Sequence, residues 1–335
     1  MDILPLVFMG IMGVSLLLYV ILDGYDLGIG MLLPLASAAQ KDTMIASIGP
    51  FWDANETWLV LGVGVLLIAF PTAHGLVLSA LYVPVTVMLI GLILRGVSFD
   101  FRVKADVRQK RMWNRAFALG SLVASCAQGW MLGSYVTGLQ TGPLNLAFAA
   151  LIAVTLPALY LVLGAAWLLL KTEDALFDKA ARWGRNAMLP MGVALLAVSV
   201  ATPVVSPTIA AKWFSLPNFI GLMPIPIATV VAFLAVFWLL HRNATGRVGH
   251  AWLVLAGTVL MCVMAALGLA YSLYPYVVLD RLTVWEAAAA HNSLQFVLVG
   301  VAIVLPFTLV YTVFVYHIFR GKVRNLTYGE GPTPL

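Results

Sequence analysis

Residues 4–30 read LPLVFMGIMGVSLLLYVILDGYDLGIG, and no charged side chain occurs in this stretch before Asp23. An α-helix rises about 1.5 Å per residue, so about 20 apolar residues cross the roughly 30 Å of hydrocarbon in a bilayer. The stretch is therefore long enough to span a membrane as one helix. It predicts a membrane protein whose first helix carries acidic side chains in its inner part.

The whole chain has the composition of a protein dissolved in lipid. Of its 335 residues, 62% are hydrophobic and 10% are charged, and the mean hydropathy is +0.99. Soluble domains contain about 25% charged residues, which they need to face water. The net charge of +5 resides in short loops between apolar runs, so it is a topology signal and not a nucleic-acid footprint. We expect an all-α polytopic membrane protein that binds no nucleic acid.

Nine apolar runs are long enough to cross the bilayer. The loops between them are too short for a soluble domain, so residues 1–335 are expected to form a single integral-membrane domain. The longest predicted loops are 95–114 on the inner side and 206–219 and 275–292 on the outer side. The predicted helices cover residues 4–33, 54–70, 76–94, 115–136, 146–170, 188–205, 220–240, 252–274 and 294–319.

Lysine and arginine are distributed unequally between the two sides of the predicted membrane. If the amino end is outside, 17 of the 19 basic residues fall on the inner side, and only Lys212 and Arg281 fall on the outer side. Cytoplasmic loops retain an excess of Lys and Arg, so the amino terminus is predicted outside and the carboxyl terminus in the cytoplasm. The inner residues are Lys41, Arg95, Arg102, Lys104, Arg108, Lys110, Arg111, Arg115, Lys171, Lys179, Arg182, Arg185, Arg242, Arg247, Arg320, Lys322 and Arg324.

Two acids and two glycines occupy the inner part of the first predicted helix. Asp23 and Asp26 are three positions apart, so they share one face of the helix. An ionisable side chain inside a span is costly and is a functional hypothesis by default. Gly24 and Gly28 form a pair of small residues that allows a neighbouring helix to approach closely.

The second predicted helix starts from the same side with Asp53 and Glu56, again three positions apart. Acids at a helix amino end are stabilised by the macrodipole and by unpaired N–H groups, so a plain N-cap role for Asp53 is a serious alternative. Arg95 and Arg102 flank the inner end of the third helix, with Asp100 between them. These charges form either an ion-pair network that holds three helices or a route for proton uptake. The residues alone favour the structural role.

No metal or haem site is expected in this chain. Cys126 and Cys262 lie in separate apolar runs without a CxxC or Cys/His spacing, which predicts buried thiols. None of the five histidines has a recognisable His or Met partner across the membrane, so we expect interfacial residues and no cofactor bound by this chain. The histidines are His74, His241, His250, His291 and His317.

Several of these stretches, in this order and spacing, resemble subunit II of the cytochrome bd-type ubiquinol oxidases. The resemblance covers essentially the whole chain, and its length and compact loops are similar to the shorter, cyanide-insensitive branch. Each motif alone is weak, but together they are specific. The motifs are DGYDLGIG at Asp23–Gly30, PFWDANETWL at Pro50–Leu59, LRGVSFDFR at Leu94–Arg102, LTVWEA at Leu282–Ala287 and YTVFVYHIFRGKV at Tyr311–Val323.

This resemblance implies two four-helix bundles plus one additional helix, in a bacterial inner membrane. It implies a partner of similar fold, subunit I, that carries two b-type haems, one d-type haem and the quinol-binding loop. Such a complex oxidises quinol, reduces dioxygen to water and draws the chemical protons from the cytoplasm. A small single-helix accessory subunit, membrane lipid and quinone are further partners that the resemblance suggests.

Roles of single residues follow from the same resemblance. Asp53 matches the acid associated with the proton entrance in subunit II, and Asp23 and Asp26 match the acidic pair of its first helix. The two arginines of LRGVSFDFR match the basic residues that close the third helix. Glu56 stands where other members often have Gln, so its role does not carry over.

Two other interpretations use the same residues. A stand-alone secondary transporter could couple protons to a substrate through these carboxylates. Such transporters usually contain broken helices in two matching halves, and here a candidate break occurs only at Asp23-Gly24. A purely structural scaffold for a haem subunit differs from the oxidase interpretation only in whether the carboxylates matter for turnover.

Overall fold

The computed structural model describes residues 2–244 and 250–323. Within these residues nine helices are long and apolar enough to cross a membrane, which confirms the predicted all-α membrane fold. Arg247 and Arg324 of the basic residues counted above lie outside the described residues. The nine helices are α1 (Leu4–Leu32), α3 (Trp52–Ala69), α4 (Pro71–Lys104), α5 (Val107–Val136), α6 (Pro143–Lys171), α7 (Asp174–Val205), α10 (Pro224–Ala244), α11 (Ala251–Leu273) and α13 (His291–Ile318).

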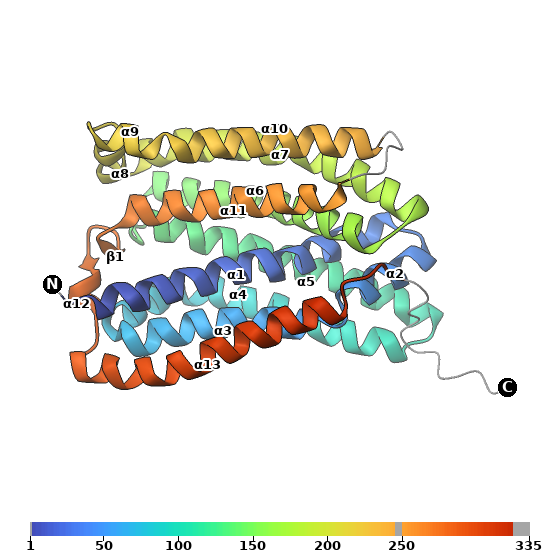
Figure 1. Cartoon of the computed structure of the whole chain (residues 1–335), viewed down its shortest axis with the longest axis horizontal. Coiled ribbons are helices and arrows are strands. Elements are labelled where there is room, and N and C mark those ends of the chain that lie inside the picture. Colours follow the sequence, from blue (N-terminus) through green and yellow to red (C-terminus); the bar gives the residue numbers. More distant parts are fainter. Residues whose placement is uncertain (1, 245–249, 324–335) are drawn as a thin grey trace.

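The long helices form two four-helix bundles and one outlying helix (Figure 1). The first bundle contains α1, α3, α4 and α5, and the second contains α6, α7, α10 and α11. The bundles meet where α1 and α5 pack against α6. Helix α13 lies along the outside of α3 at the edge of the first bundle. This is the architecture that the family resemblance predicted.

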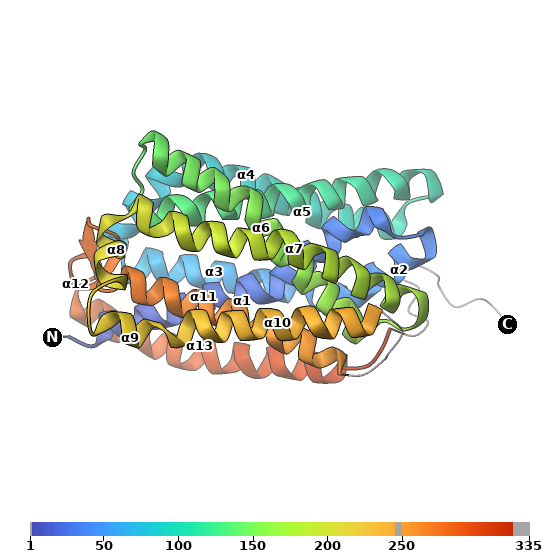
Figure 2. The same cartoon turned by 90° about the horizontal axis from the view of Figure 1, so that it is seen from above.

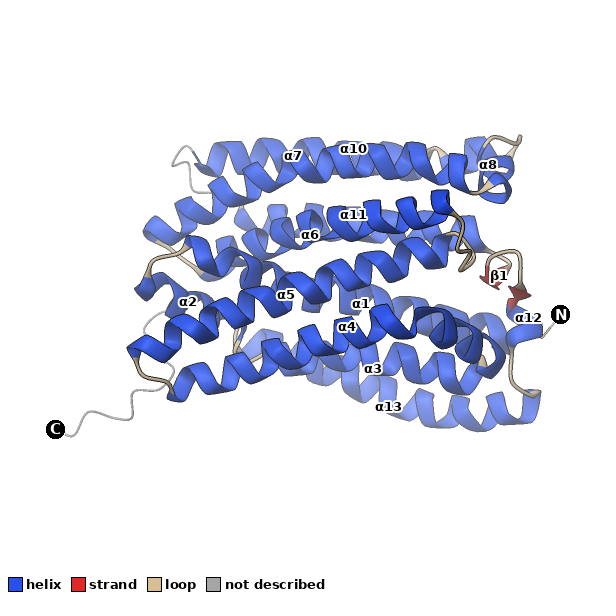
Figure 3. Cartoon of the chain, turned by 180° about the vertical axis from the view of Figure 1, so that it is seen from behind, coloured by secondary structure: helices blue, strands red, loops and turns tan. Residues whose placement is uncertain are grey.

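Short elements close the two ends of the molecule (Figures 2 and 3). At the amino-terminal end lie α8 (Pro207–Trp213), α9 (Asn218–Leu222), the antiparallel strands β1 (Tyr276–Val278) and β2 (Leu282–Thr283), and α12 (Val284–Ala287). At the opposite end lie the 3-10 turn η1 (Leu33–Leu35) and α2 (Ala38–Ile48), close to the last described residues. We call these the β end and the α2 end.

Residue Asp2 is tied to the β end. Its carbonyl oxygen accepts a hydrogen bond of 3.0 Å from Trp285 Nε1, and its Oδ2 lies 2.5 Å from His291 Nδ1. The hydrogen bond to His291 lowers the pKa of Asp2. The two termini of the described chain thus lie at opposite ends of the bundle, as an odd number of spans requires.

The stretch 95–114, which we predicted to be the longest inner loop, is almost entirely helical. Helix α4 continues to Lys104 and α5 begins at Val107, so that Ala105 and Asp106 alone separate them. Helix α7 likewise begins at Asp174, well before the predicted residue 188. Both helices are longer than a bilayer needs and extend beyond the apolar part of the bundle.

The loop prediction was wrong because it ended the third helix at its first charged residue. In the folded chain Arg95 and Arg102 are 1% and 4% exposed and have carboxylate partners, so the helix continues through them. Asp106 then begins α5 as its N-cap residue, since its side chain accepts a hydrogen bond of 2.9 Å from Gln109 N.

The outside of the bundle is apolar, as a protein in contact with lipid requires. Large aliphatic and aromatic side chains on α4, α7, α10 and α13 are exposed along most of their length. Cys262 is buried in the second bundle as predicted, whereas Cys126 is only partly buried. The expectation of buried thiols is therefore wrong for Cys126.

Helices α1 and α6 cross at close range because both carry glycine at the crossing. A Cβ atom on Gly28 would lie 1.8 Å from the carbonyl oxygen of Tyr160, and one on Gly164 would lie 2.6 Å from the carbonyl carbon of Gly28. A Cβ atom on Gly24 would lie 2.9 Å from the Tyr160 ring. The close approach expected of the Gly24–Gly28 pair is therefore confirmed, and it joins the two bundles.

We expect Gly28→Ala to destabilise the protein by at least about 1–3 kcal/mol, because the backbones of α1 and α6 must separate to admit the methyl group. The matched control is Gly13→Ala on the same helix, where an added Cβ meets nothing within 4 Å. The measurement is the thermal unfolding midpoint of the purified protein in mild detergent. Equal midpoints for the two variants would contradict the proposed role of the crossing.

Candidate functional site

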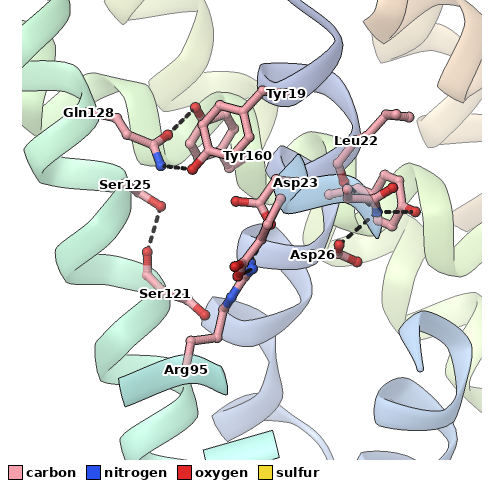
Figure 4. A network of polar contacts seen from close by, with 12 residues as sticks. Tyr19, Leu22, Asp23, Asp26, Arg95, Ser121, Ser125, Gln128 and Tyr160 are labelled. Atoms are coloured by element: carbon pink, nitrogen blue, oxygen red, sulfur yellow. Dashed lines mark hydrogen bonds and ion pairs between the residues drawn. The ribbon is translucent and has the colours of Figure 1, made fainter. Parts of the chain in front are cut away.

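A cluster of charged side chains is buried between α1, α3 and α4. Asp23 and Asp26 of α1 are both 0% exposed, and Arg95 of α4 is 1% exposed. Arg95 Nη1 lies 2.6 Å from Asp23 Oδ1, and Arg95 Nη2 donates to Glu56 Oε1 of α3. One guanidinium therefore bridges carboxylates from two other helices. We call Asp23, Asp26, Glu56 and Arg95 the charge cluster, and Figure 4 labels Asp23, Asp26 and Arg95.

The charge cluster contains three carboxyl groups and a single positive charge. Unpaired ions in a bundle that is surrounded by lipid are costly, because neither the hydrocarbon nor the apolar core solvates them. If all three carboxyls were ionised, two negative charges would be uncompensated, and at least one of them would lie on Asp23 or Asp26, which are both fully buried. The arrangement therefore favours protons bound within the charge cluster, and carboxyl groups can release and rebind them.

Asp26 accepts a hydrogen bond from one amide, and two phenols are hydrogen-bonded to that amide. Asn55 Nδ2 on α3 donates to Asp26 Oδ2 and to Tyr25 Oη, both at 2.8 Å. Tyr316 on α13 donates to Asn55 Oδ1 at 3.0 Å, and the hydroxyls of Tyr25 and Tyr316 share a hydrogen bond. The other carboxyl oxygen of Asp26, Oδ1, has no hydrogen-bond partner among the described residues.

A second polar group extends from Asp23 toward α5 and α6 (Figure 4). Gln128 Nε2 donates to Tyr19 Oη at 2.7 Å, and Tyr160 Oη donates to Gln128 Oε1 at 2.6 Å. Tyr19 lies one turn before Asp23 on α1. Buried polar groups are stable in an apolar bundle when they are hydrogen-bonded to one another, so this group extends the polar interior toward the middle of the span.

Aromatic side chains enclose the Asp26 side of the site. Tyr25 stacks on Trp167 with ring centroids 4.2 Å apart and an interplanar angle of 10°. Phe51 packs edge-on against Trp167, with ring centroids 5.3 Å apart, and at a tilt of 39° against Tyr316, with centroids 4.6 Å apart. These rings form an apolar group beside the Asn55 amide, which is the hydrogen-bond partner of Asp26.

The remaining residues that sequence analysis singled out lie apart from the charge cluster. Asp53 and Asp100 are exposed near the α2 end and have no hydrogen bond among the described residues. Arg102 binds Asp42 Oδ1 of α2 at 2.6 Å and Asn114 Oδ1 of α5 at 2.5 Å. It therefore fastens α2 to the α4–α5 hairpin.

The N-cap alternative for Asp53 does not describe this structure. Helix α3 begins with Phe51 as its N-cap residue and has no side-chain capping bond, so Asp53 is an acid of the first turn. Its side chain points to the surface, whereas Glu56, one turn later, has a side chain that is 29% exposed and reaches Arg95.

Sequence analysis missed the neutral partners of the charged residues. Asn55, Tyr25 and Gln128 are buried, and Asn55 stands directly beside the predicted Glu56 in the chain. A polar amide within an apolar run was the available signal for Asn55 and Gln128. Tyr316 lies in the motif Tyr311–Val323, but nothing local indicated that it would contact Asn55, which is far away in the sequence.

Haem and metal ligands do not gather at this site. All five histidines lie at the ends of long helices, and no group of three or more His, Cys, Asp or Glu side chains among the described residues could hold a metal ion. The residues of the site therefore do not fit a haem, and their chemistry is that of protons and charge.

The family model and the similar proteins of known name all point to one family. The model of the family described as cytochrome bd terminal oxidase subunit II matches residues 4–319. Cytochrome bd ubiquinol oxidase subunit 2 of Bacillus subtilis (strain 168) is 27% identical over 326 residues, which cover 91% of this chain and 92% of the relative. Cytochrome bd-I ubiquinol oxidase subunit 2 of Escherichia coli (strain K12) is 26% identical over 371 residues, which cover 97% of this chain and 96% of the relative.

A solved structure of bd oxidase from Geobacillus thermodenitrificans has a similar fold. The TM-score is 0.76, the sequence identity is 17%, and the superposition covers 95% of this chain and 99% of that chain. At this identity the likeness concerns the fold, and it agrees with the arrangement of two bundles and an outlying helix described above.

We expect Arg95→Gln to lower the free energy of unfolding by about 3–5 kcal/mol, because it leaves Asp23 buried without its countercharge. Adding Asp23→Asn to Arg95→Gln is expected to recover part of that loss. The control is Arg102→Gln, which should lower the free energy of unfolding by a smaller amount, because its partner Asp42 is 46% exposed and water can solvate the carboxylate that is left. Thermal unfolding in detergent measures all three, and equal losses for the two arginine variants would count against a buried ion pair at Arg95.

Proposed function

The chain belongs to the cytochrome bd terminal oxidase subunit II family, and we propose that its charge cluster takes up protons for the oxidase. The protein is a subunit of a bd-type quinol oxidase, an oxygen-reducing enzyme complex of a bacterial respiratory chain. This family membership replaces the alternative of a stand-alone transporter. Reduction of dioxygen to water consumes protons, so a proton route is a function that such a subunit can supply.

We further propose that the haems belong to a partner, subunit I, which carries two b-type haems and one d-type haem. The position of the histidines supports this assignment, since all five lie at or beside the ends of long helices and none lies in the middle of one. When bound in the complex, these haems supply electron transfer and oxygen reduction. This chain would then contribute protons, charge balance and a surface for the partner.

The proposed orientation places the α2 end in the cytoplasm and the amino terminus in the periplasm. Lys212 and Arg281, the two basic residues expected outside, belong to the β end. The basic residues of α2 and of the α4–α5 hairpin belong to the opposite end. Because cytoplasmic segments retain positive charge, this distribution supports the assignment.

The proposed route begins at the α2 end and passes from the surface to the buried acids. Asp53 is exposed in the first turn of α3, and Glu56 follows one turn deeper with part of its side chain exposed. A proton taken from water by a carboxylate at the surface would pass to Glu56 and then to Asp23 and Asp26. Arg95 would keep the charge of the cluster balanced as each proton moves.

The observation that supports this proposal most is the excess of carboxyl groups over countercharges in the charge cluster. A purely structural ion-pair network needs equal numbers of opposite charges, whereas a proton route needs groups that can be neutral or charged. The bridging position of Arg95 between three helices favours a structural contribution as well. Both contributions are compatible in the same residues.

We expect Asp53→Asn to lower quinol-driven oxygen uptake by roughly tenfold or more, with the haem content of the complex unchanged, because a neutral amide cannot accept a proton. The matched control is Asp100→Asn, which removes an exposed carboxylate at the same end of the neighbouring helix α4. Oxygen uptake and haem absorbance are measured on the purified complex.

Loss of both activity and haem in Asp53→Asn would indicate a role in assembly instead. Full activity would remove Asp53 from the route. An equal loss in Asp100→Asn would show that surface charge alone matters.

A further inference from the structure

Helix α13 is weakly buried along its length. Among the described residues of this helix, only Leu294 is fully buried, and large side chains such as Phe296, Phe307 and Phe314 are exposed. The views in Figures 1 and 3 place α13 on the outer edge of the first bundle, beside α3. Apolar packing within this chain therefore determines its position less than it does for the other spans.

The inner end of α13 is attached by specific polar contacts. The Tyr316 hydroxyl bonds Asn55 and Tyr25, and the Tyr316 ring packs against Phe51 with centroids 4.6 Å apart. After the helix ends, Lys171 Nζ donates to the Phe319 carbonyl, and Val323 N donates to the Lys171 carbonyl at 2.8 Å. These contacts place the Tyr316 hydroxyl against the side of Asn55 that faces away from Asp26.

Two contacts with fixed hydrogen-bond direction determine which way the Asn55 amide faces: the Tyr316 hydroxyl donates to Oδ1, and Asn55 Nδ2 donates to the Leu22 carbonyl at 3.3 Å. An amide side chain presents an oxygen acceptor on one side and an NH₂ donor on the other. Because Tyr316 donates to Oδ1, the NH₂ group is turned toward Asp26 Oδ2 and Tyr25 Oη. Tyr25 in turn donates to the Tyr316 oxygen, so every polar hydrogen in this group has an acceptor.

Without the Tyr316 hydroxyl, the opposite orientation of Asn55 becomes less unfavourable, and the Leu22 carbonyl alone opposes it. The amide oxygen would then face Asp26, where it could accept a hydrogen bond from a protonated carboxyl but would repel a carboxylate. The native orientation is suited to the carboxylate form, which accepts from the NH₂ group. The hydroxyl thus selects between two hydrogen-bonding environments of Asp26.

We propose that Tyr316 is a positioning residue for proton transfer, which acts on Asp26 through the orientation of the Asn55 amide. This inference rests on the proposed proton route through Asp26. It assigns to α13, a helix at the edge of the molecule, control over a buried acid of α1. Tyr316 itself does not carry the proton along this path, because the amide between it and Asp26 is not a proton carrier.

Several other charged and titratable groups surround Asp26, and the experiment must separate them from Tyr316. They are Asp23 and Tyr25 on α1, Glu56 on α3, Arg95 on α4 and Tyr316 on α13. The α5 side chains nearest the cluster, Ser121, Ser125 and Gln128, do not titrate. A change confined to the Tyr316 hydroxyl leaves all the other groups in place.

The test uses the complete oxidase complex with Tyr316→Phe, which keeps the ring and removes only the hydroxyl. The control is Tyr311→Phe on the same helix, since Tyr311 is 58% exposed and has no hydrogen bond among the described residues. Infrared difference spectra recorded during a pH change give the carboxyl stretching band of Asp26. Its assignment comes from the loss of the band in Asp26→Asn.

In Tyr316→Phe we expect the Asp26 band to shift and the pH profile of oxygen uptake to move to higher pH by about one unit, the equivalent of one hydrogen bond. In Tyr311→Phe both should stay as in the wild type. An unchanged band and profile in a folded, haem-replete Tyr316→Phe complex would overturn the proposal.

Failure of the proton route gives a different result from failure of this inference. If Asp26→Asn retains full oxygen uptake, Asp26 is not on the route and the proposed function fails in that part. In that case the infrared band still shows whether Tyr316 positions the carboxyl group, because the band does not depend on turnover.

Discussion

The insolubility of charge in lipid is the constraint on which the rest of this structure depends. A bilayer offers no partner for a polar group, so each buried charge must find one within the protein. In this chain Arg95 meets Asp23 and Glu56, and three helices must hold fixed positions for that contact to exist. The same constraint explains why α4 can continue as a helix through two arginines: both are paired, and neither needs to reach water.

Close packing makes this charge cluster possible. The glycines at the α1–α6 crossing bring two backbones into direct contact, which fixes α1 against the second bundle. The backbone of Tyr160 lies at that crossing, and its hydroxyl donates a hydrogen bond to Gln128 in the polar interior. Tyr160 therefore belongs both to the close helix crossing between the bundles and to the polar group with Gln128. A shift of this turn of α6 would move both.

The site combines residues from within the first bundle with one residue, Tyr316, from the outlying helix α13. Arg95, Asp23 and Glu56 belong to helices of one bundle, whereas the amide beside Asp26 is oriented by a tyrosine from the outlying α13. A helix with an exposed apolar face is also the part of the chain that a second subunit can contact. The protonation of Asp26 and the position of α13 are thus connected through two hydrogen bonds, from Tyr316 to Asn55 and from Asn55 to Asp26.

The sequence by itself determined the number of spans, the family and the depth of the acids, because hydrophobicity, motif order and position along a helix are local properties. It did not determine which polar groups meet. Asp53 and Glu56 are three residues apart, yet only Glu56 reaches the charge cluster, since Asp53 lies in the exposed first turn of α3 and Glu56 lies one turn nearer to Arg95. Asn55, Arg102 and Tyr316 acquired their partners only through tertiary packing, because those partners lie on other helices and no local pattern records how neighbouring helices turn toward one another.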